Sequence, residues 1–237
     1  MKKFIISIDA GTTSNRSILF DLKGKPIFSS QKEFTQFFPK SGWVEHNPDE
    51  IWKTTIKTLK DVIQKAKKLK GKILSIGITN QRETTVLWDK KTGKAVYRAI
   101  VWQDRRTEEF CKKLRKQNKD TMVFNKTGLL IDSYFSGTKI KWILDNVPRA
   151  KALMSKKQLL FGTIDSFLIW RLTKGKVHAT DATNASRTMI YNISSNKWDD
   201  TILKLLKIEK HILPEVKDCA DDYGQTHSSI TGKSIPI

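Results

Sequence analysis

The first residues in the chain that could carry chemistry form a turn directly after a short, mostly apolar segment, residues 4–8. Asp9 follows this segment, and the turn then supplies Gly11, Thr12, Thr13, Ser14 and Arg16. A carboxylate at a strand end can hold Mg²⁺, which takes few protein ligands and keeps its waters. A glycine lets the backbone approach a phosphate, and hydroxyl and N–H groups donate to its oxygens. The turn is therefore a candidate metal and phosphate site, although an ordinary hairpin turn explains the local pattern equally well.

A second group of candidates follows the next apolar segment, residues 73–79. Arg82 and Glu83 place a cation beside a carboxylate where a strand is expected to end, and ligands bind at such ends in α/β sheets. Together they offer the donors and acceptors that suit a polyhydroxy substrate. Trp102 could pack on the carbon atoms of a small ligand, and Tyr134 could donate a phenolic hydrogen bond. The alternatives are a surface ion pair for the first two residues and core packing for the two aromatic residues.

The surrounding pattern predicts the elements that would position these residues. Segments 4–8, 16–22 and 27–34 have the features of strands joined by short turns, which favours an antiparallel meander. An amphipathic helix begins at Asn47-Pro48 and ends at Gly71. Further strands are expected at 73–79, 85–89, 95–102 and 159–164, and further helices at 106–118, 137–146, 165–172 and 199–206. Strand meanders that alternate with helices predict an α/β fold with a mixed sheet flanked by helices.

Composition and charge narrow the class of protein. Among 237 residues, 44 lysines and arginines outnumber 24 acidic residues, which gives a net charge of +20. The lysines are scattered along the chain, which favours a solvated basic surface over a nucleic-acid-binding patch. The charge would still attract anions such as nucleotides.

Cysteine usage and hydropathy point to the cytosol. Cys111 and Cys219 lie far apart and lack metal-ligand spacing, as is usual in a reducing compartment. The first apolar run stops at Asp9, too soon for a signal peptide, and no run of about 18 apolar residues is present to span a membrane. The four histidines are scattered and receive no role. We therefore expect a cytoplasmic protein without a membrane span.

Several long segments together resemble the FGGY carbohydrate kinases, and among them the members that phosphorylate glycerol. The segments are SIDAGTTSNRS, GWVEHNPDEIW, IGITNQRETT, AIVWQDRRT, SYFSGTKIKWILD, LLFGTIDSFLIWRLT, ATDATNASRTM and YGQTH. The resemblance extends from Phe4 to Ile237. It implies an actin-like, ribonuclease-H-like fold in which residues 1–237 form the N-terminal one of two kinase domains, with the active site between the two.

The resemblance also implies roles for the candidate residues. Asp9 would organise Mg²⁺. The ATP phosphates would be contacted by Gly11, Thr12, Thr13, Ser14 and Arg16. Glycerol would be contacted by Arg82, Glu83, Trp102 and Tyr134. The implied reaction moves the γ-phosphoryl group of ATP to a terminal hydroxyl of glycerol, and such reactions depend on positioning and on neutralising the phosphoryl charge.

Two departures from the family pattern carry expectations of their own. The family's catalytic aspartate follows an Ile-Pro-Ile strand, whereas this sequence stops at Ile235-Pro236-Ile237. We therefore expect the catalytic residue and the adenosine pocket of the second domain to lie beyond Ile237, and the chain alone to have no useful kinase activity. Ser234 stands where members inhibited by fructose 1,6-bisphosphate carry an arginine, so that control is not expected here.

Two alternatives remain open from the sequence. Another FGGY kinase, acting on a pentulose or similar sugar, would share much of the pattern, although the set of four substrate contacts favours glycerol. A truncated, non-catalytic basic module would instead bind polyelectrolytes in a way that weakens steeply with salt. The expected ligands are glycerol, ATP or ADP, and Mg²⁺. The expected protein partner is the second domain, homo-oligomerisation is left open, and no nucleic acid is expected.

Overall fold

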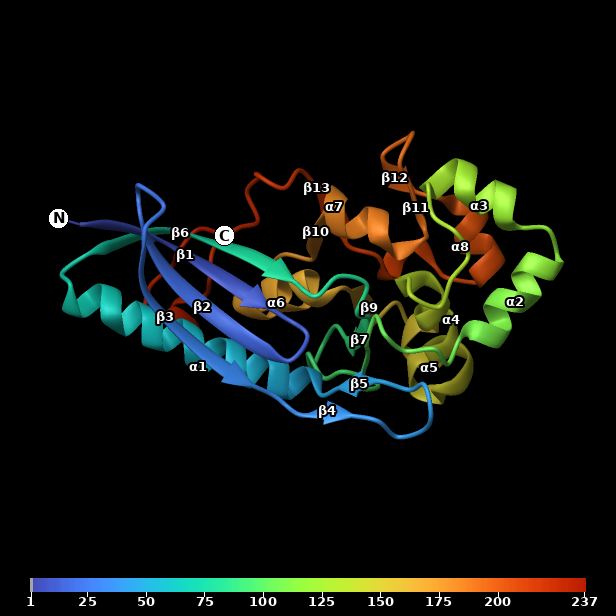
Figure 1. The fold of residues 1–237 in the computed structure, drawn as a ribbon, viewed down its shortest axis with the longest axis horizontal. Coiled ribbons are helices and arrows are strands. Elements are labelled where there is room, and N and C mark those ends of the chain that lie inside the picture. Colours follow the sequence, from blue (N-terminus) through green and yellow to red (C-terminus); the bar gives the residue numbers. More distant parts are fainter. Residues whose placement is uncertain (1) are drawn as a thin grey trace.

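The computed structural model describes residues 2–237, and a four-stranded mixed sheet dominates the N-terminal part (Figure 1). In spatial order its strands are β3 (Pro26–Glu33), β2 (Ser14–Asp21), β1 (Lys3–Ala10) and β6 (Lys72–Asn80). The predicted meander is confirmed, because β1, β2 and β3 pair in antiparallel orientation. β6 pairs with β1 in parallel orientation and aligns Asn80 with Ala10. Both strands therefore end at the same edge of the sheet.

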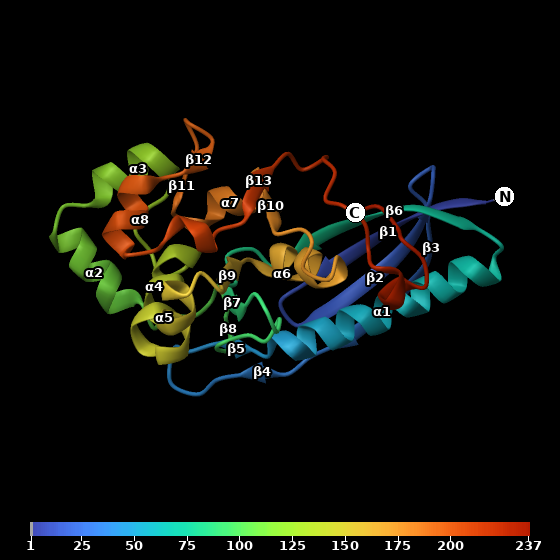
Figure 2. The same cartoon turned by 180° about the vertical axis from the view of Figure 1, so that it is seen from behind.

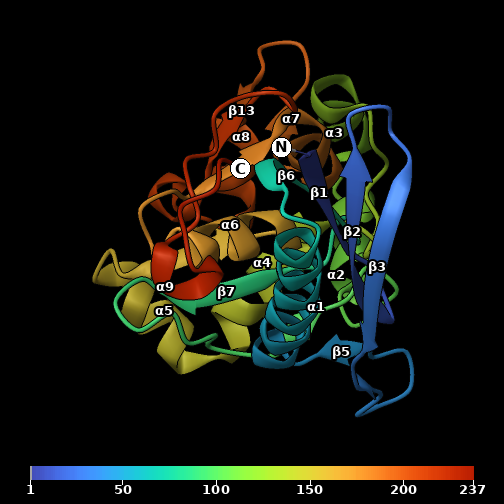
Figure 3. The same ribbon diagram turned by 90° about the vertical axis from the view of Figure 1, so that its left-hand side faces the viewer.

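One helix, α1 (Pro48–Lys68), packs along this sheet against β2 and β3 (Figure 3). The Asn47 side chain accepts a hydrogen bond from the Asp49 N–H at 3.0 Å, and Pro48 occupies a first-turn position that needs no N–H donor. Alternate residues of β1, such as Ile6 and Ile8, are fully buried and belong to the same core as the apolar face of α1. The cap and the periodicity predicted this helix correctly.

The rest of the chain adds helices and short strands, most of which form a region beyond one end of the sheet, while α6 packs against β6 and α9 against α1 (Figures 1 and 2). Its helices are α2 (Glu108–Lys116), α3 (Asp120–Thr127), α4 (Ser136–Asn146), α5 (Pro148–Ser155), α6 (Ile164–Leu172), α7 (Ala182–Ala185), α8 (Asp200–Leu206) and α9 (Ser228–Thr231), with 3₁₀ turns η1 (Ser186–Thr188) and η2 (Lys210–Ile212). The short strands are β4 (Gln36–Phe37), β5 (Glu45–His46), β7 (Val86–Asp89), β8 (Ala99–Ile100), β9 (Leu159–Gly162), β10 (Ala179–Asp181), β11 (Tyr191–Asn192), β12 (Lys197–Trp198) and β13 (Glu215–Lys217). The four helices predicted in this region correspond to α2, α4, α6 and α8, whereas α3, α5 and the single-turn helices α7 and α9 were not predicted.

The strands predicted at 85–89 and 95–102 pair with each other only in part, although they are consecutive in the sequence. Two isolated bridges join the segments, Thr85 with Ile100 and Trp88 with Ala95, while the ladder of β7 forms with β9. β8 pairs with β5. Every residue of β7 is buried, so its backbone groups need ladder partners, and a buried strand from later in the chain supplies them.

The β7–β9 pair separates two hydrophobic cores. Leu87 and Phe161 belong to the core among the helices, whereas Trp88 and Leu160 belong to the core beneath the sheet. Successive residues of a strand point to opposite faces, so one short ladder serves both cores. The sheet region and the helical region therefore both pack against the β7–β9 ladder.

The strand β6 lies at an edge of the main sheet. Within residues 2–237, its outer side makes one backbone hydrogen bond, from the Ile76 N–H to the Pro236 carbonyl at 2.9 Å. A hollow of about 100 Å³ adjoins Ile237 and Ile76–Ile78. Within residues 2–237, no helix is both long enough and apolar enough to cross a bilayer.

Candidate active site

The glycine–threonine turn joins β1 to β2 beside the shared edge of β1 and β6. The Gly11 N–H donates to the Ser14 carbonyl at 3.0 Å and closes the turn. A Cβ at Gly11 would lie 3.2 Å from that oxygen, so a side chain here would crowd the turn. Arg16 donates from Nη2 to Asp9 Oδ2 at 2.8 Å, and both side chains are partly exposed. The turn thus presents the Asp9 carboxylate, the Arg16 guanidinium and the Gly11 backbone, which no side chain covers, at an accessible edge.

Gln81 ties this turn to the end of β6. Its N–H donates to the Ala10 carbonyl at 2.8 Å, and its Nε2 donates to the Gly11 carbonyl at 2.9 Å. His46 lies behind the same amide, with Nδ1 3.3 Å from Gln81 Nε2 and Nε2 2.5 Å from Gln36 Oε1. Burial lowers the pKa of His46 to about 4, so the ring is neutral near pH 7 and can accept from one amide while donating to the other. These contacts hold the two strand ends as one unit.

Glu83 is the most constrained of the expected site residues. Its side chain is 2% exposed, and its Oε1 accepts a hydrogen bond from Arg187 Nε at 2.6 Å. Its carbonyl accepts from Ser136 Oγ at 2.9 Å. Its φ of 61° lies in the left-handed region, which costs a non-glycine residue on the order of 1–3 kcal/mol and is concentrated at functional sites. The surrounding contacts therefore hold this carboxylate in one place.

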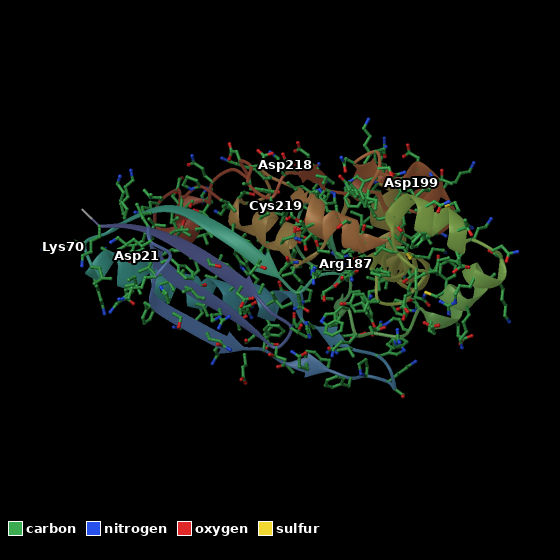
Figure 4. The ribbon with its side chains drawn as sticks, turned by 45° about the horizontal axis from the view of Figure 1, so that its top comes forward. Asp21, Lys70, Arg187, Asp199, Asp218 and Cys219 are labelled. Carbon is green, nitrogen blue, oxygen red and sulfur yellow. The ribbon has the colours of Figure 1, made fainter. Side chains whose placement is uncertain are left out.

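An aromatic wall connects the turn to Glu83. Trp102 Nε1 donates to Thr12 Oγ1 at 3.1 Å. The Trp102 ring packs on the Tyr134 ring, with centroids 5.4 Å apart. Arg187, which Figure 4 shows where the sheet edge meets the helical region, brings its guanidinium carbon 5.6 Å from the Tyr134 centroid. The structure therefore joins the turn, Trp102 and Tyr134 by direct contacts, and Arg187 links Tyr134 to Glu83.

Arg82 lies next to this wall but faces a different hollow. Its side chain is exposed and lines a hollow of about 390 Å³ together with Asn80, Asp181 and Asn184. The same segment, 181–188, supplies both the far side of this hollow and Arg187. Segment 181–188 therefore contacts both sides: it lines the hollow that contains Arg82, and it supplies Arg187 to the aromatic wall.

Asp165, at the start of α6, is a buried carboxylate beside the hollow that adjoins Ile76–Ile78. Asp165 accepts hydrogen bonds from Thr180 Oγ1 at 2.6 Å and Asn80 Nδ2 at 3.3 Å, and also from Thr163. Burial raises the pKa of Asp165 to about 6 in spite of these donors. Asp165 is not among the candidates predicted from the sequence, because a lone aspartate near a helix start is most simply a cap.

Comparison with known proteins identifies the domain. The sequence model of the N-terminal domain of the FGGY family of carbohydrate kinases matches residues 4–237. The chain belongs to this family. The glycerol kinases of Rhizobium meliloti and Alkaliphilus oremlandii are 56% and 57% identical to it, covering 100% of this chain and 48% and 47% of those proteins. The structure of Plasmodium falciparum glycerol kinase with ADP matches with a TM-score of 0.95 at 36% identity, over 100% of this chain and 47% of that one. A gluconate kinase from Lactobacillus acidophilus matches with a TM-score of 0.87 at 25% identity, over 99% and 47%.

These findings confirm the expected fold class and the resemblance to glycerol kinases. The chain spans about half the length of the curated relatives it matches. The matched half contains the two strand ends, the turn and the aromatic wall described above. The roles of individual residues remain predictions.

Arg187 belongs to the candidate site by its contacts, and reasoning from the sequence missed it. It lies 104 positions after its partner Glu83. A buried glutamate needs a cation, but the chain offers 44 lysines and arginines, so the need alone does not identify the partner. Only the tertiary fold, which brings η1 to Glu83, selects Arg187.

Proposed function

We propose that residues 1–237 form the first domain of a kinase that transfers the γ-phosphoryl group of ATP to glycerol. The observation that supports this most is the hydrogen bond from Trp102 to Thr12, at 3.1 Å. This bond connects the glycine–threonine turn to the aromatic wall, which supports a site where phosphates and a small polyol meet. A phosphoryl transfer needs these two substrates in contact, and positioning provides much of its rate.

On the polyol side, the carboxylate of Glu83 accepts substrate hydroxyls. Its Oε1 is held by Arg187, which leaves Oε2 for the ligand. Trp102 and Tyr134 cover the carbon chain, and Arg82 closes the site from the adjoining hollow. Sites built around such hydrogen bonds reject analogues that lack a hydroxyl by about 10⁴–10⁵-fold.

On the nucleotide side, the turn from Gly11 to Ser14 and the guanidinium of Arg16 contact the phosphates. Asp9 fits a hydrated Mg²⁺, because its carboxylate sits at the accessible edge and only Oδ2 is taken by Arg16. A Cβ at Gly11 would lie 4.0 Å from Asp9 Oδ1, so the missing side chain leaves room beside this oxygen. The metal, when bound, neutralises charge on the transferred phosphoryl group.

The remaining parts of the site come from a second domain in this proposal. The relatives are about twice as long as the chain, and the catalytic base and adenosine pocket are assigned to that additional length. The outer side of β6, which makes one backbone hydrogen bond within residues 2–237, and its adjoining hollow offer the second domain a surface beside the site. Both cysteines are unpaired, which fits the reducing cytosol where we place the kinase.

A chimera tests this function. Residues 1–237 are fused to the second half of the Rhizobium meliloti glycerol kinase, and ADP release is measured with glycerol, xylulose or gluconate as acceptor. We expect turnover with glycerol, loss of glycerol affinity in a Glu83→Gln chimera, and no useful turnover by the 237-residue chain alone. If the chimera prefers xylulose or gluconate, the proposed substrate is wrong and the domain belongs to another FGGY sugar kinase. An inactive chimera whose N-terminal half binds RNA in a steeply salt-dependent way would favour a basic binding module.

A further inference from the structure

Lys139 is a charged side chain that the proposed chemistry does not use, and it is completely buried. It lies in the N-terminal half of α4, has 0% exposure and ranks among the largest fully buried side chains of the described residues. A cation near a helix N-terminus opposes the helix dipole, and burial adds a desolvation cost. Burial accordingly lowers the pKa of the Lys139 ammonium to about 7, against the opposing influence of Asp104 and Glu83. A methionine of similar length would avoid both costs, so the ammonium needs a specific explanation.

The explanation lies in the three groups that the ammonium contacts. Nζ donates to the carbonyls of Ser133 at 2.6 Å, Tyr134 at 2.5 Å and Phe135 at 3.3 Å. An ammonium has three N–H donors, and three consecutive carbonyls take them all. No carboxylate contacts Nζ within residues 2–237, so Lys139 is not half of an ion pair but a clamp on one short backbone segment.

That segment carries the tyrosine of the aromatic wall. The Tyr134 N–H is held from the other side by Asp132 Oδ1 at 2.7 Å. With both sides of its backbone fixed, the ring meets Trp102 at 5.4 Å and lies 5.6 Å from the guanidinium carbon of Arg187. The segment between α3 and α4 belongs to no ladder, and its own backbone adds one turn bond, from the Phe135 N–H to the Asp132 carbonyl at 3.4 Å. Side-chain contacts, of which the three Lys139 bonds are the most numerous, therefore hold most of this backbone in place.

We propose that Lys139 is a positioning residue, which fixes the Ser133–Phe135 backbone so that Tyr134 stands against Trp102 and Arg187. The effect on glycerol rests on the proposed function, whereas the placement of Tyr134 does not. Lys139 touches neither substrate nor metal in the proposed site and acts only through Tyr134. The alternative is that the three carbonyls only compensate the buried ammonium of Lys139 and do not need it. In that case, replacing Lys139 by a well-packed apolar side chain would leave the Tyr134 ring in its place.

The test uses the 237-residue chain labelled with fluorotyrosine. Its four tyrosines give separate ¹⁹F resonances, and the Tyr134→Phe variant assigns the one of interest. Lys139→Met removes the three donors at similar volume. Lys141→Met is the matched control, since Lys141 is in the same helix and pairs with Asp145 near the surface. Urea unfolding of each variant separates a local change from global loss of stability.

We expect Lys139→Met to shift and broaden the Tyr134 resonance while the other three tyrosines and the Lys141→Met spectrum stay as in the parent chain. An unchanged Tyr134 resonance in folded Lys139→Met would overturn the proposal. If that variant does not fold, Lys139→Gln decides, because its amide can reach only two of the three carbonyls. Broadening confined to Tyr134 is then expected, and a parent-like resonance overturns the proposal. Glycerol titrated into the parent chain tests the function separately, since a silent Tyr134 resonance there would count against the polyol site and not against the clamp.

Discussion

Replacing Arg106 by methionine should destabilise this domain far more than removing a charge from its surface. Arg106 donates to Asp104 through Nε at 2.9 Å and Nη2 at 2.8 Å, and to Glu45 through Nη2 at 2.8 Å. The three side chains are 0%, 0% and 3% exposed. The guanidinium carbon also lies 3.7 Å from the centroid of the Trp43 ring and 4.6 Å from that of Trp142. One cation therefore compensates two buried carboxylates and joins β5, the end of β8 and α4.

The size of the effect follows from burial. Removing one partner of a buried ion pair costs about 3–5 kcal/mol, because the other charge is left without compensation. For a domain of this size, each kcal/mol lowers the melting temperature by about 2–4 °C, so the loss should be about 6–20 °C. Arg98→Met is the matched control, because Arg98 contacts the same Glu45 at 3.6 Å with a side chain that is 46% exposed. An exposed pair of this kind contributes about 0–1 kcal/mol.

Urea unfolding and thermal melting of the two variants measure this difference. Combining Arg106→Met with Glu45→Gln and Asp104→Asn should recover part of the loss, since the uncompensated charges are then removed. Equal destabilisation by Arg106→Met and Arg98→Met would refute the reasoning, because burial would then not set the cost. A triple variant that is less stable than Arg106→Met alone would show that packing, not charge, dominates the site.

Three further outcomes are expected. In the two-domain chimera, Arg82→Ala and Glu83→Ala should each weaken glycerol binding, because each leaves polar partners unpaired; unchanged affinity by calorimetry in both would remove them from the site. Trp102→Phe keeps the ring but loses the donor to Thr12, so we expect a loss of about 0.5–1.5 kcal/mol in ATP binding with a smaller effect on glycerol, and the reverse ranking would contradict the proposed division of the site. The pKa of Asp165 is raised from 3.8 to about 6, so its contribution to the stability of the folded state decreases as pH rises through that range. The pKa values of His46 and His178 are lowered from 6.5 to about 4, so their contribution to stability increases as pH rises through that range. Asp165→Asn removes the opposing contribution, so its melting temperature should rise more steeply than that of the parent chain between pH 4 and 6.5, and an identical slope in calorimetry would show that Asp165 does not titrate there.

The local parts of the fold were readable from the sequence because their signals are local. The Asn47 cap with Pro48 marked the start of α1, and the β-branched and aromatic residues of segment 4–8 marked β1. The candidate turn and aromatic residues were also placed together by the structure, since β1 and β6 end at one edge.

The parts that failed depend on contacts distant in sequence. The pairing of Leu87 with Phe161 cannot be inferred from a strand whose residues are all buried, because such a strand shows no alternation to fix its partner. The ion pair of Glu83 with Arg187 and the clamp formed by Lys139 likewise depend on tertiary packing. A buried lysine resembles any surface lysine when it is read in a chain of net charge +20.

The exposed edge of β6 has a practical consequence for handling the chain. The strand KILSIGITN carries one charged residue, at its first position, whereas β3 at the opposite edge carries Pro26, Lys32 and Glu33. Charges and proline keep foreign strands from adding to an edge, and β6 lacks them along its second half. Concentrated solutions should therefore aggregate through β6 first, and a lysine introduced at Gly77 should keep the chain dispersed.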